Sequence, residues 1–143
     1  MVKFEKILSS IILKLKTKIP GIDVQSQDIK EGFSRPSFFV ELDNIKIDDF
    51  MKNVQEKNIT ARIIYFPSSK EKNQLELLQM MDSLNDCFLV DNVLKLDEDT
   101  TTQIETINIE EVDNVLHLDF DIYIAEMYIR DIITEMMEEL NLE

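Results

Sequence analysis

Three side chains that could bind a metal ion occupy every second position near the end of the sequence: His117, Asp119 and Asp121. Residues at i, i+2 and i+4 of a strand share one face of a sheet, and an imidazole with two carboxylates can ligate a divalent cation. The polar face of a half-buried strand gives the same spacing. Because the sequence has only one histidine, we favour the polar face and expect no metal and no cofactor.

The single cysteine, Cys87, is the other candidate for chemistry. A cysteine nucleophile needs a base, and His117 is the only imidazole available. Cys87 lies among apolar residues in a predicted helix, which is typical of a buried structural thiol. The segment 97–101 begins like a calcium loop but lacks the central glycine and the closing glutamate. We therefore predict a solvated acidic turn there, and no enzymatic activity.

The charge of the chain narrows the classes of partner. The 143 residues include 29 Asp and Glu against 15 Lys and Arg, a net charge of −14. A general nucleic-acid binder carries a basic patch, and an anionic membrane also attracts basic segments, so both classes are disfavoured. No apolar stretch approaches the roughly 20 residues of a transmembrane helix, and no secretory signal is recognisable. We expect a protein made in the cytoplasm that does not bind membranes.

The first half of the chain predicts one helix and three strands. Apolar residues at helical spacing predict a helix over residues 3–19, ended by Pro20 and Gly21. A short strand is expected within 22–29. Alternation predicts a strand over 37–47, broken by two aspartates, and a second over 58–66, so that the two form an antiparallel hairpin with a long connection.

The second half predicts a helix, further strands and a C-terminal tail. Ser68 and Ser69 offer an N-cap for a helix over 71–89. A short strand is expected at 93–96. Strands at 101–112 and 115–125 flank Asp113 and Asn114, residue types that permit a two-residue hairpin turn. The predicted fold is α+β, one domain over 1–143: a mainly antiparallel sheet, an N-terminal and a central helix packed on it, and a helical or arm-like tail.

The two ends of the chain carry opposite charge. The first 18 residues contain five Lys and one Glu, and residues 126–143 contain six acidic residues and one Arg. The tail has helical apolar spacing from Ile129 to Leu140. It either packs on its own sheet or lies as an arm on a neighbouring subunit. The residues that we expect at an interface with another subunit or with a tube are Lys3, Lys6, Lys14, Arg35, Ile132, Met136 and Met137.

Three segments of the sequence are more specific to a family than the overall composition is. They are residues 31–42 (EGFSRPSFFVEL), residues 65–67 (YFP) ahead of a leucine-rich helix, and residues 112–118 (VDNVLHL) at the hairpin turn. In this order and spacing, from about residue 3 to residue 125, the chain resembles the tail terminator proteins of long-tailed phages and of phage-like particles of Gram-positive bacteria. None of these segments is catalytic, so the resemblance rests on structural residues.

The resemblance implies a structural protein of a virion or phage-like particle, including headless, bacteriocin-like particles. It implies a ring, usually of six copies, that caps the tail tube, stops its elongation and forms the joining surface for the head or neck. The implied partners are other copies of the chain, the tail tube protein, and either a head or neck connector or, in a contractile tail, the sheath. No cofactor and no enzymatic activity are implied.

The acidic surplus suits such a ring, since like charge keeps passing DNA from binding to the bore. The candidate bore residues are Asp97, Glu98, Asp99, Glu105 and Glu111. Arg35 is expected to bind a carboxylate, in its own subunit or in the next. We also expect Gly32 to adopt positive φ and Pro36 to hold Arg35 extended.

Two other classes of function stay open on sequence grounds. The first is an adaptor or inhibitor whose acidic surface imitates DNA and binds a basic partner. The second is a small enzyme that uses the His117 face. A structural ring protein is our leading interpretation.

Overall fold

The computed structural model describes residues 1–26 and 34–128. Its elements, in chain order, are α1 (Phe4–Lys18), β1 (Asp23–Gln25), β2 (Ser37–Met51), β3 (Val54–Phe66), α2 (Gln74–Asn85), the π-helical turn η1 (Asp86–Val90), β4 (Val93–Lys95), β5 (Thr101–Gln103), β6 (Asn108–Val112) and β7 (Val115–Met127). None of the helices in these ranges is long and apolar enough to span a bilayer.

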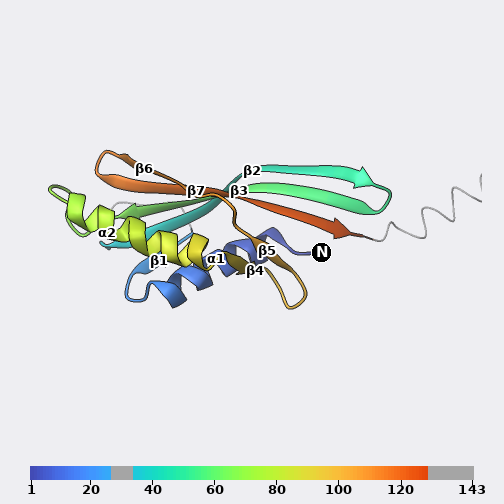
Figure 1. Ribbon diagram of the computed structural model, residues 1–143, viewed down its shortest axis with the longest axis horizontal. Helices are drawn as coiled ribbons and strands as arrows, with labels where there is room; N and C mark the ends of the chain where they lie inside the picture. The colour runs from blue at the N-terminus through green and yellow to red at the C-terminus, as the bar shows by residue number, and fades with distance from the viewer. Residues whose placement is uncertain (27–33, 129–143) are drawn as a thin grey trace, which may run out of the picture.

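A five-stranded sheet in the order β1-β2-β3-β7-β6 forms one layer, and β4 pairs with β5 in a separate small sheet. The pairings in the large sheet are antiparallel except for β1 with β2. Both helices and the β4–β5 hairpin lie on one face of the large sheet (Figure 1). The predicted α+β fold, with a mainly antiparallel sheet and two packed helices, is confirmed.

The core lies between the helices and the strand residues that face them. Every second residue of β3 and β7 is buried there, in keeping with the period of a strand. Helix α1 buries one face, as its apolar spacing predicts. The core residues on these three elements are Ile7, Ile11, Leu15, Ile59, Ala61, Ile63, Tyr65, Leu116, Leu118, Phe120, Ile122 and Ile124.

The prediction for the β2–β3 hairpin was wrong in its connection. Asp48 and Asp49 do not end β2, which runs to Met51, and only two residues separate it from β3. Asn53 has φ 69° in this turn. Register shifts between Asp43 and Lys46, and again between Asp49 and Met51, mark β-bulges that admit extra residues without ending the strand.

Two further boundaries differ from the predictions. The expected strand over 101–112 is two strands, β5 and β6. β5 pairs with β4, away from the large sheet. Buried Ile104, which follows β5, donates its N–H to the carbonyl of Asn92 before β6 begins. Helix α2 begins at Gln74, and the preceding Asn73 makes no capping bond. The Asn73 amide instead donates to the carbonyls of Ser69 and Asn114, which ties the loop to the β6–β7 turn.

The predicted turn between β6 and β7 is confirmed. Asp113 and Asn114 have φ of 53° and 62°, the left-handed pair that a tight hairpin turn requires. The same register brings Glu110 opposite His117 and Asn108 opposite Asp119. The turn therefore decides which residues stand beside the candidate metal ligands.

Candidate assembly surfaces

The His117 face is the polar side of the sheet, turned away from the helices. The Thr60 hydroxyl donates to the Asp121 carboxylate at 3.0 Å, and the Asn108 amide donates to Asp119 at 3.2 Å. His117 is half-buried, between Ile64 of β3 and Glu110 of β6 in the register. Within residues 1–26 and 34–128 no three His, Cys, Asp or Glu side chains group closely enough to hold a metal ion.

Arg62 organises the acidic residues on this same face. Its Nη1 lies 3.1 Å from a Glu41 oxygen and 3.0 Å from an Asp43 oxygen. The hydrogen bond to Glu41 raises the pKa of Arg62 above its ordinary value. Cross-strand pairing of this kind stabilises a sheet, so these charges have a structural role within the chain.

Cys87 is the buried thiol that its surroundings predict. It is 1% exposed and donates weakly to the Lys14 carbonyl at 3.9 Å. Burial raises the pKa of Cys87 to about 11. A thiol that stays protonated at neutral pH is a poor nucleophile.

The basic residues of α1 differ in how they are used. Lys14 is mostly buried and donates to the carbonyls of Asp91 and Val93, the latter at 2.6 Å. Lys18 pairs with the Asp91 carboxylate at 3.0 Å, which raises the pKa of Lys18 and lowers that of Asp91. Lys3 and Lys6 are exposed. Of the three lysines predicted at an interface, Lys3 and Lys6 are therefore open to a partner, and Lys14 joins α1 to the end of η1.

Arg35 lies against its own chain, at the start of β2. Its guanidinium carbon is 5.6 Å from the centre of the Phe66 ring, and Nη1 donates to the Pro67 carbonyl at 3.2 Å. The Arg35–Pro36 peptide bond is cis. These contacts hold the guanidinium at the loop that follows β3. The expectation for Gly32 lies outside the described residues.

The five candidate bore residues come from three places. Asp97, Glu98 and Asp99 lie between β4 and β5, Glu105 lies between β5 and β6, and Glu111 lies on β6. Asp97 accepts the N–H groups of Asp99 and Thr100 at 2.8 and 2.7 Å, which closes the predicted acidic turn. Figure 1 shows the β6–β7 turn at one end of the sheet and the β4–β5 hairpin beneath the sheet, well away from that turn. The other four residues are exposed, but they do not form one patch.

Sequence reasoning missed a buried ion pair. Lys57 is 4% exposed, and its ammonium lies 3.1 Å from an oxygen of Glu126. The other Glu126 oxygen accepts the N–H of Val2 at 2.8 Å, and the ammonium lies 5.3 Å from the centre of the Phe4 ring. The pair fastens the segment before α1 to the sheet. The only signal in the sequence is a lysine at an inward-facing position of a strand.

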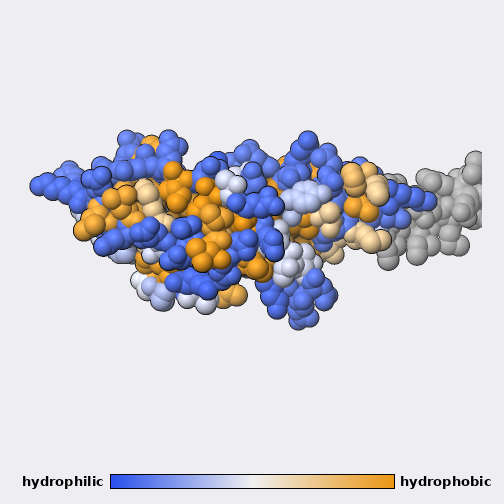
Figure 2. All heavy atoms as spheres, viewed as in Figure 1, coloured by the Kyte–Doolittle hydropathy of each residue, from blue (hydrophilic) through white to orange (hydrophobic). Residues whose placement is uncertain are grey.

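Sequence reasoning also missed an exposed apolar surface at the far end of the sheet. Strands β2, β3 and β7 extend beyond the N-terminus of α1, and residues 44–58 and 121–127, which include this extension, are here called the distal sheet (Figure 1). Figure 2 shows hydrophobic side chains at this end of the molecule. The exposed apolar residues at this end are Ile45, Ile47, Phe50, Met51, Tyr123 and Met127, the last 81% exposed. They are divided between the two faces of the sheet, because Ile47 stands opposite buried Lys57, which points toward the helices, whereas Tyr123 stands opposite exposed Asn58, which points away from them.

The remaining interface candidates, Ile132, Met136 and Met137, lie outside the described residues, as does the choice between a tail packed on its own sheet and an arm. The tail begins directly after the distal sheet. Tyr128 donates its hydroxyl to Asp49 at 2.8 Å, which holds the chain beside the β2–β3 turn as it leaves β7.

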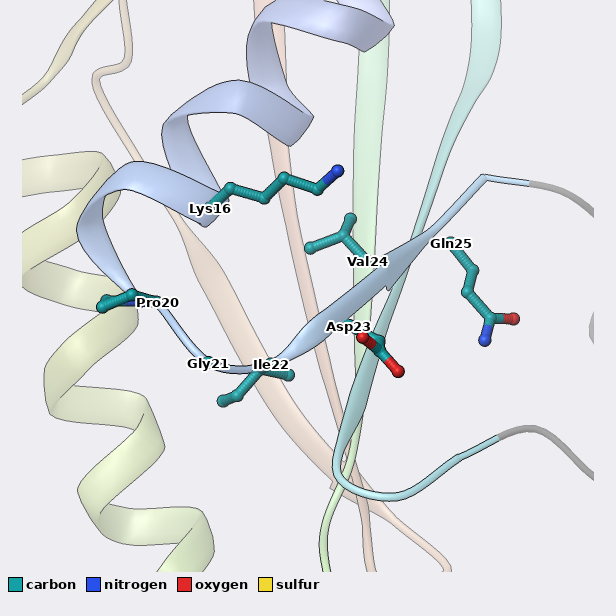
Figure 3. Close-up of a pocket in the computed structure, with 7 residues that line it drawn as sticks. All are labelled: Lys16, Pro20, Gly21, Ile22, Asp23, Val24 and Gln25. Carbon is teal, nitrogen blue, oxygen red and sulfur yellow. The ribbon is translucent and has the colours of Figure 1, made fainter.

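A hollow of about 500 Å³ lies where α1 turns into β1. Figure 3 shows Asp23 and Gln25 on the same side of β1 and the Lys16 ammonium set apart from both. Small-molecule sites bring a few polar groups together on one ligand. This hollow does not, and it lends no support to an enzymatic site.

Comparison with solved structures shows the same fold in a tail component. The chain is similar to a solved structure described as the cryo-EM structure of an extracellular contractile injection system, PVC sheath/tube terminator in extended state. The TM-score is 0.57 and the identity 12%, over 90% of this chain and 57% of that one. The chain thus spans little more than half the length of that protein. Comparison with curated protein sequences finds no match.

The sequence itself settles the family. The family model described as phage tail terminator protein matches residues 6–135, which include α1 from its third residue onward, all of α2 and every strand of the large sheet. This range covers the three segments on which the resemblance rests. The chain belongs to the phage tail terminator protein family.

Proposed function

We propose that this chain is a structural subunit that caps the end of a tail tube, stops its elongation and presents the surface to which the next component joins. The match to the terminator family over residues 6–135 carries this proposal. The shared fold with a sheath/tube terminator supports it. The protein works by shape and contact. Of the side chains that could take part in chemistry, Asp119 and Asp121 accept hydrogen bonds from neighbouring strands, and Cys87 is buried in the core.

The subunit acts as a ring of identical copies, six in number, that rests on the last ring of tube subunits. A ring closes when two different patches of the same chain meet. Exposed Lys3 and Lys6, at the start of α1, supply a basic patch, and exposed carboxylates on other elements supply acidic ones. Its further partners are the tube protein and a head or neck connector, or the sheath where the tail is contractile.

The bore of this ring is acidic and passes DNA without binding it. The exposed carboxylates of Glu98, Asp99, Glu105 and Glu111 are the candidates, supported by the net charge of −14. Replacing all four by Lys should make assembled rings retain DNA that the parent does not retain. Rings that bind DNA no better after this reversal would remove these residues from the bore.

Tail length is the measurement that tests the capping role. Deletion of the gene should give tails of uncontrolled, excess length or tails without joined heads, seen by negative-stain microscopy. Complementation with the intact gene is the control and should restore uniform length. Tails of normal length and normal joining in the deletion strain would contradict the proposal.

A further inference from the structure

A second exposed surface lies on the helix side of the molecule and combines apolar with basic side chains. Lys6 and Leu13 are seven residues apart on α1, which is about two turns, so they share one side of the helix. Val93 and Lys95 flank buried Leu94 on β4, so both point away from the core. Leu13 is 66% exposed and Val93 is 46% exposed. These side chains are open to a partner.

Contacts between α1 and the start of β4 join these residues into one surface. The ammonium of Lys14, the residue after Leu13, donates to the carbonyls of Asp91 and Val93, the latter at 2.6 Å. Val90, which precedes Asp91, is 72% exposed. The members of this surface, here called the α1–β4 surface, are Lys6, Leu13, Val90, Val93 and Lys95.

The lysines of the α1–β4 surface have no internal use for their charge. Among residues 1–26 and 34–128, neither Lys6 nor Lys95 forms an ion pair. Both side chains are exposed. Exposed apolar residues beside unpaired lysines suit an amphipathic helix whose polar side is acidic.

The chain itself contains such a segment, directly after Tyr128. Residues 129–143 include five acidic residues and one Arg. A helix over residues 129–140 is about 18 Å long, which is enough to cover the roughly 11 Å from Lys6 to Leu13 along α1. Its apolar residues recur at helical spacing, at Ile129, Ile132, Ile133, Met136, Met137 and Leu140.

The start of this segment favours the surface of another copy over that of its own. Tyr128 is held at the end of the distal sheet by bonds to Asn53 and Asp49, each of 2.8 Å. In Figure 1, β7 runs past the start of α1, so a segment that returned to its own α1 would have to reverse direction. Residues 128–143 contain no glycine or proline, and the helical spacing begins at once, at Ile129. The sequence thus leaves no residues for a reversing turn.

We infer that residues 129–143 of one copy lie as an amphipathic helix on the α1–β4 surface of the next copy, so that each subunit holds its neighbour around the ring. This inference rests on the proposed function. The contact joins two different patches of the same chain, and so it repeats until the ring closes. Burial of the apolar side supplies the affinity, and the opposite charges decide which surface is chosen, since exposed ion pairs contribute little.

Cysteine cross-linking in tail particles tests this contact. Val93→Cys and Met136→Cys are combined in one chain, and the purified particles are treated with a short bismaleimide. We expect a ladder of covalent multimers from this double variant and none from either single variant. Native Cys87 is a silent background, because it is 1% exposed and protonated at neutral pH. The matched control combines Met136→Cys with Leu78→Cys, at an exposed position of α2, and should give no ladder.

The other outcomes separate this inference from the capping role. Internally cross-linked monomers would place the segment on its own copy, and an equal ladder from the Leu78→Cys control would show contact without a specific site; both results overturn the inference. Particles that contain the double variant and yield no cross-linked product also overturn it, and they leave the capping role standing. Particles that lack even the parent chain would overturn both.

A second test reverses the charges on each side of the contact. Lys6→Glu with Lys95→Glu should remove most of the incorporation into particles, because like charges then face each other. Lys70→Glu with Lys72→Glu makes the same change at exposed lysines ahead of α2 and is the matched control.

Adding Glu135→Lys and Glu138→Lys to the Lys6→Glu, Lys95→Glu chain should restore its incorporation. Unfolding midpoints confirm that each variant folds. A folded Lys6→Glu, Lys95→Glu variant that enters particles as well as the control, or one that the second reversal does not restore, would sink the inference.

Discussion

Glu76 shows how one side chain fixes the start of a helix without capping it. Its carboxylate accepts the Tyr65 hydroxyl at 2.9 Å and the Ser68 N–H at 2.8 Å, and it also accepts the Ser68 hydroxyl. Burial disfavours the charged form, but the bonds from Ser68 and Tyr65 outweigh burial and lower the pKa of Glu76. The hydroxyl that sequence reasoning assigned to an N-cap thus binds a side chain within the helix.

We expect Glu76→Gln to lower the free energy of unfolding by about 1 kcal/mol at neutral pH, because the bonds to the charged acceptor weaken. Because the pKa of Glu76 is lower in the folded state, its carboxylate stabilises the fold at pH values above its ordinary pKa of 4.5. This stabilisation is lost as the pH falls through the folded-state pKa. The difference between parent and variant should therefore shrink in acid. Urea unfolding at several pH values measures it, and a difference that does not change with pH would contradict this account.

The buried pair of Lys57 and Glu126 gives a second residue-scale prediction. Lys57→Met leaves a carboxylate buried without its cation, which costs about 3 kcal/mol. The double variant Lys57→Met, Glu126→Leu should recover most of this loss. Lys6→Met, at an exposed position of α1, is the control for losing one positive charge. Equal unfolding midpoints for Lys57→Met and Lys6→Met would refute the anchoring role of the pair.

At the scale of elements, the β6–β7 turn depends on two residues with positive φ. Asn114→Ala should destabilise the protein by about 1 kcal/mol, since alanine resists the left-handed conformation. Asn114→Gly should be as stable as the parent or more so, because glycine has no Cβ to clash. Thermal unfolding distinguishes the two variants. Equal losses of stability in the Ala and Gly variants would mean that the missing Asn114 side-chain amide, and not backbone strain, causes the effect.

The elements that pack on a core were predictable, and those that do not were missed. Helix α1 and strand β7 bury one side each, so their apolar spacing locates them within a few residues. The distal part of β2 has no core to face, and its aspartates and bulges hide the alternation. The same reason hid the apolar surface, because exposed Ile45 and Ile47 look like core residues in a sequence.

The candidate site was predictable only in part. His117, Asp119 and Asp121 share one sheet face as expected, and their neighbours Arg62, Thr60 and Asn108 come from strands that no local pattern links to them. The Lys57 and Glu126 pair is equally non-local, since 69 residues separate its members. Pairings across a sheet depend on register, which the hairpin turns set and the periodicity of one strand does not reveal.

For the whole molecule, the net charge of −14 opposes the meeting of two copies. Raising the salt concentration from 0.01 to 1 M shortens the Debye length from about 30 to about 3 Å. We therefore expect self-association of the purified chain to increase with salt, as measured by sedimentation velocity. Weaker association of the chain at high salt would oppose the prediction.

The long strands also have a mechanical consequence. β2 spans 15 residues, β3 and β7 span 13 each, and the ladder between β3 and β7 runs without a register shift. A force along the strands is shared by every bond of that ladder at once, whereas a force across them opens the bonds singly. A subunit pulled along its strands is stiffest between β3 and β7. It gives way first on the β2 side, where Asn44 leaves the regular ladder.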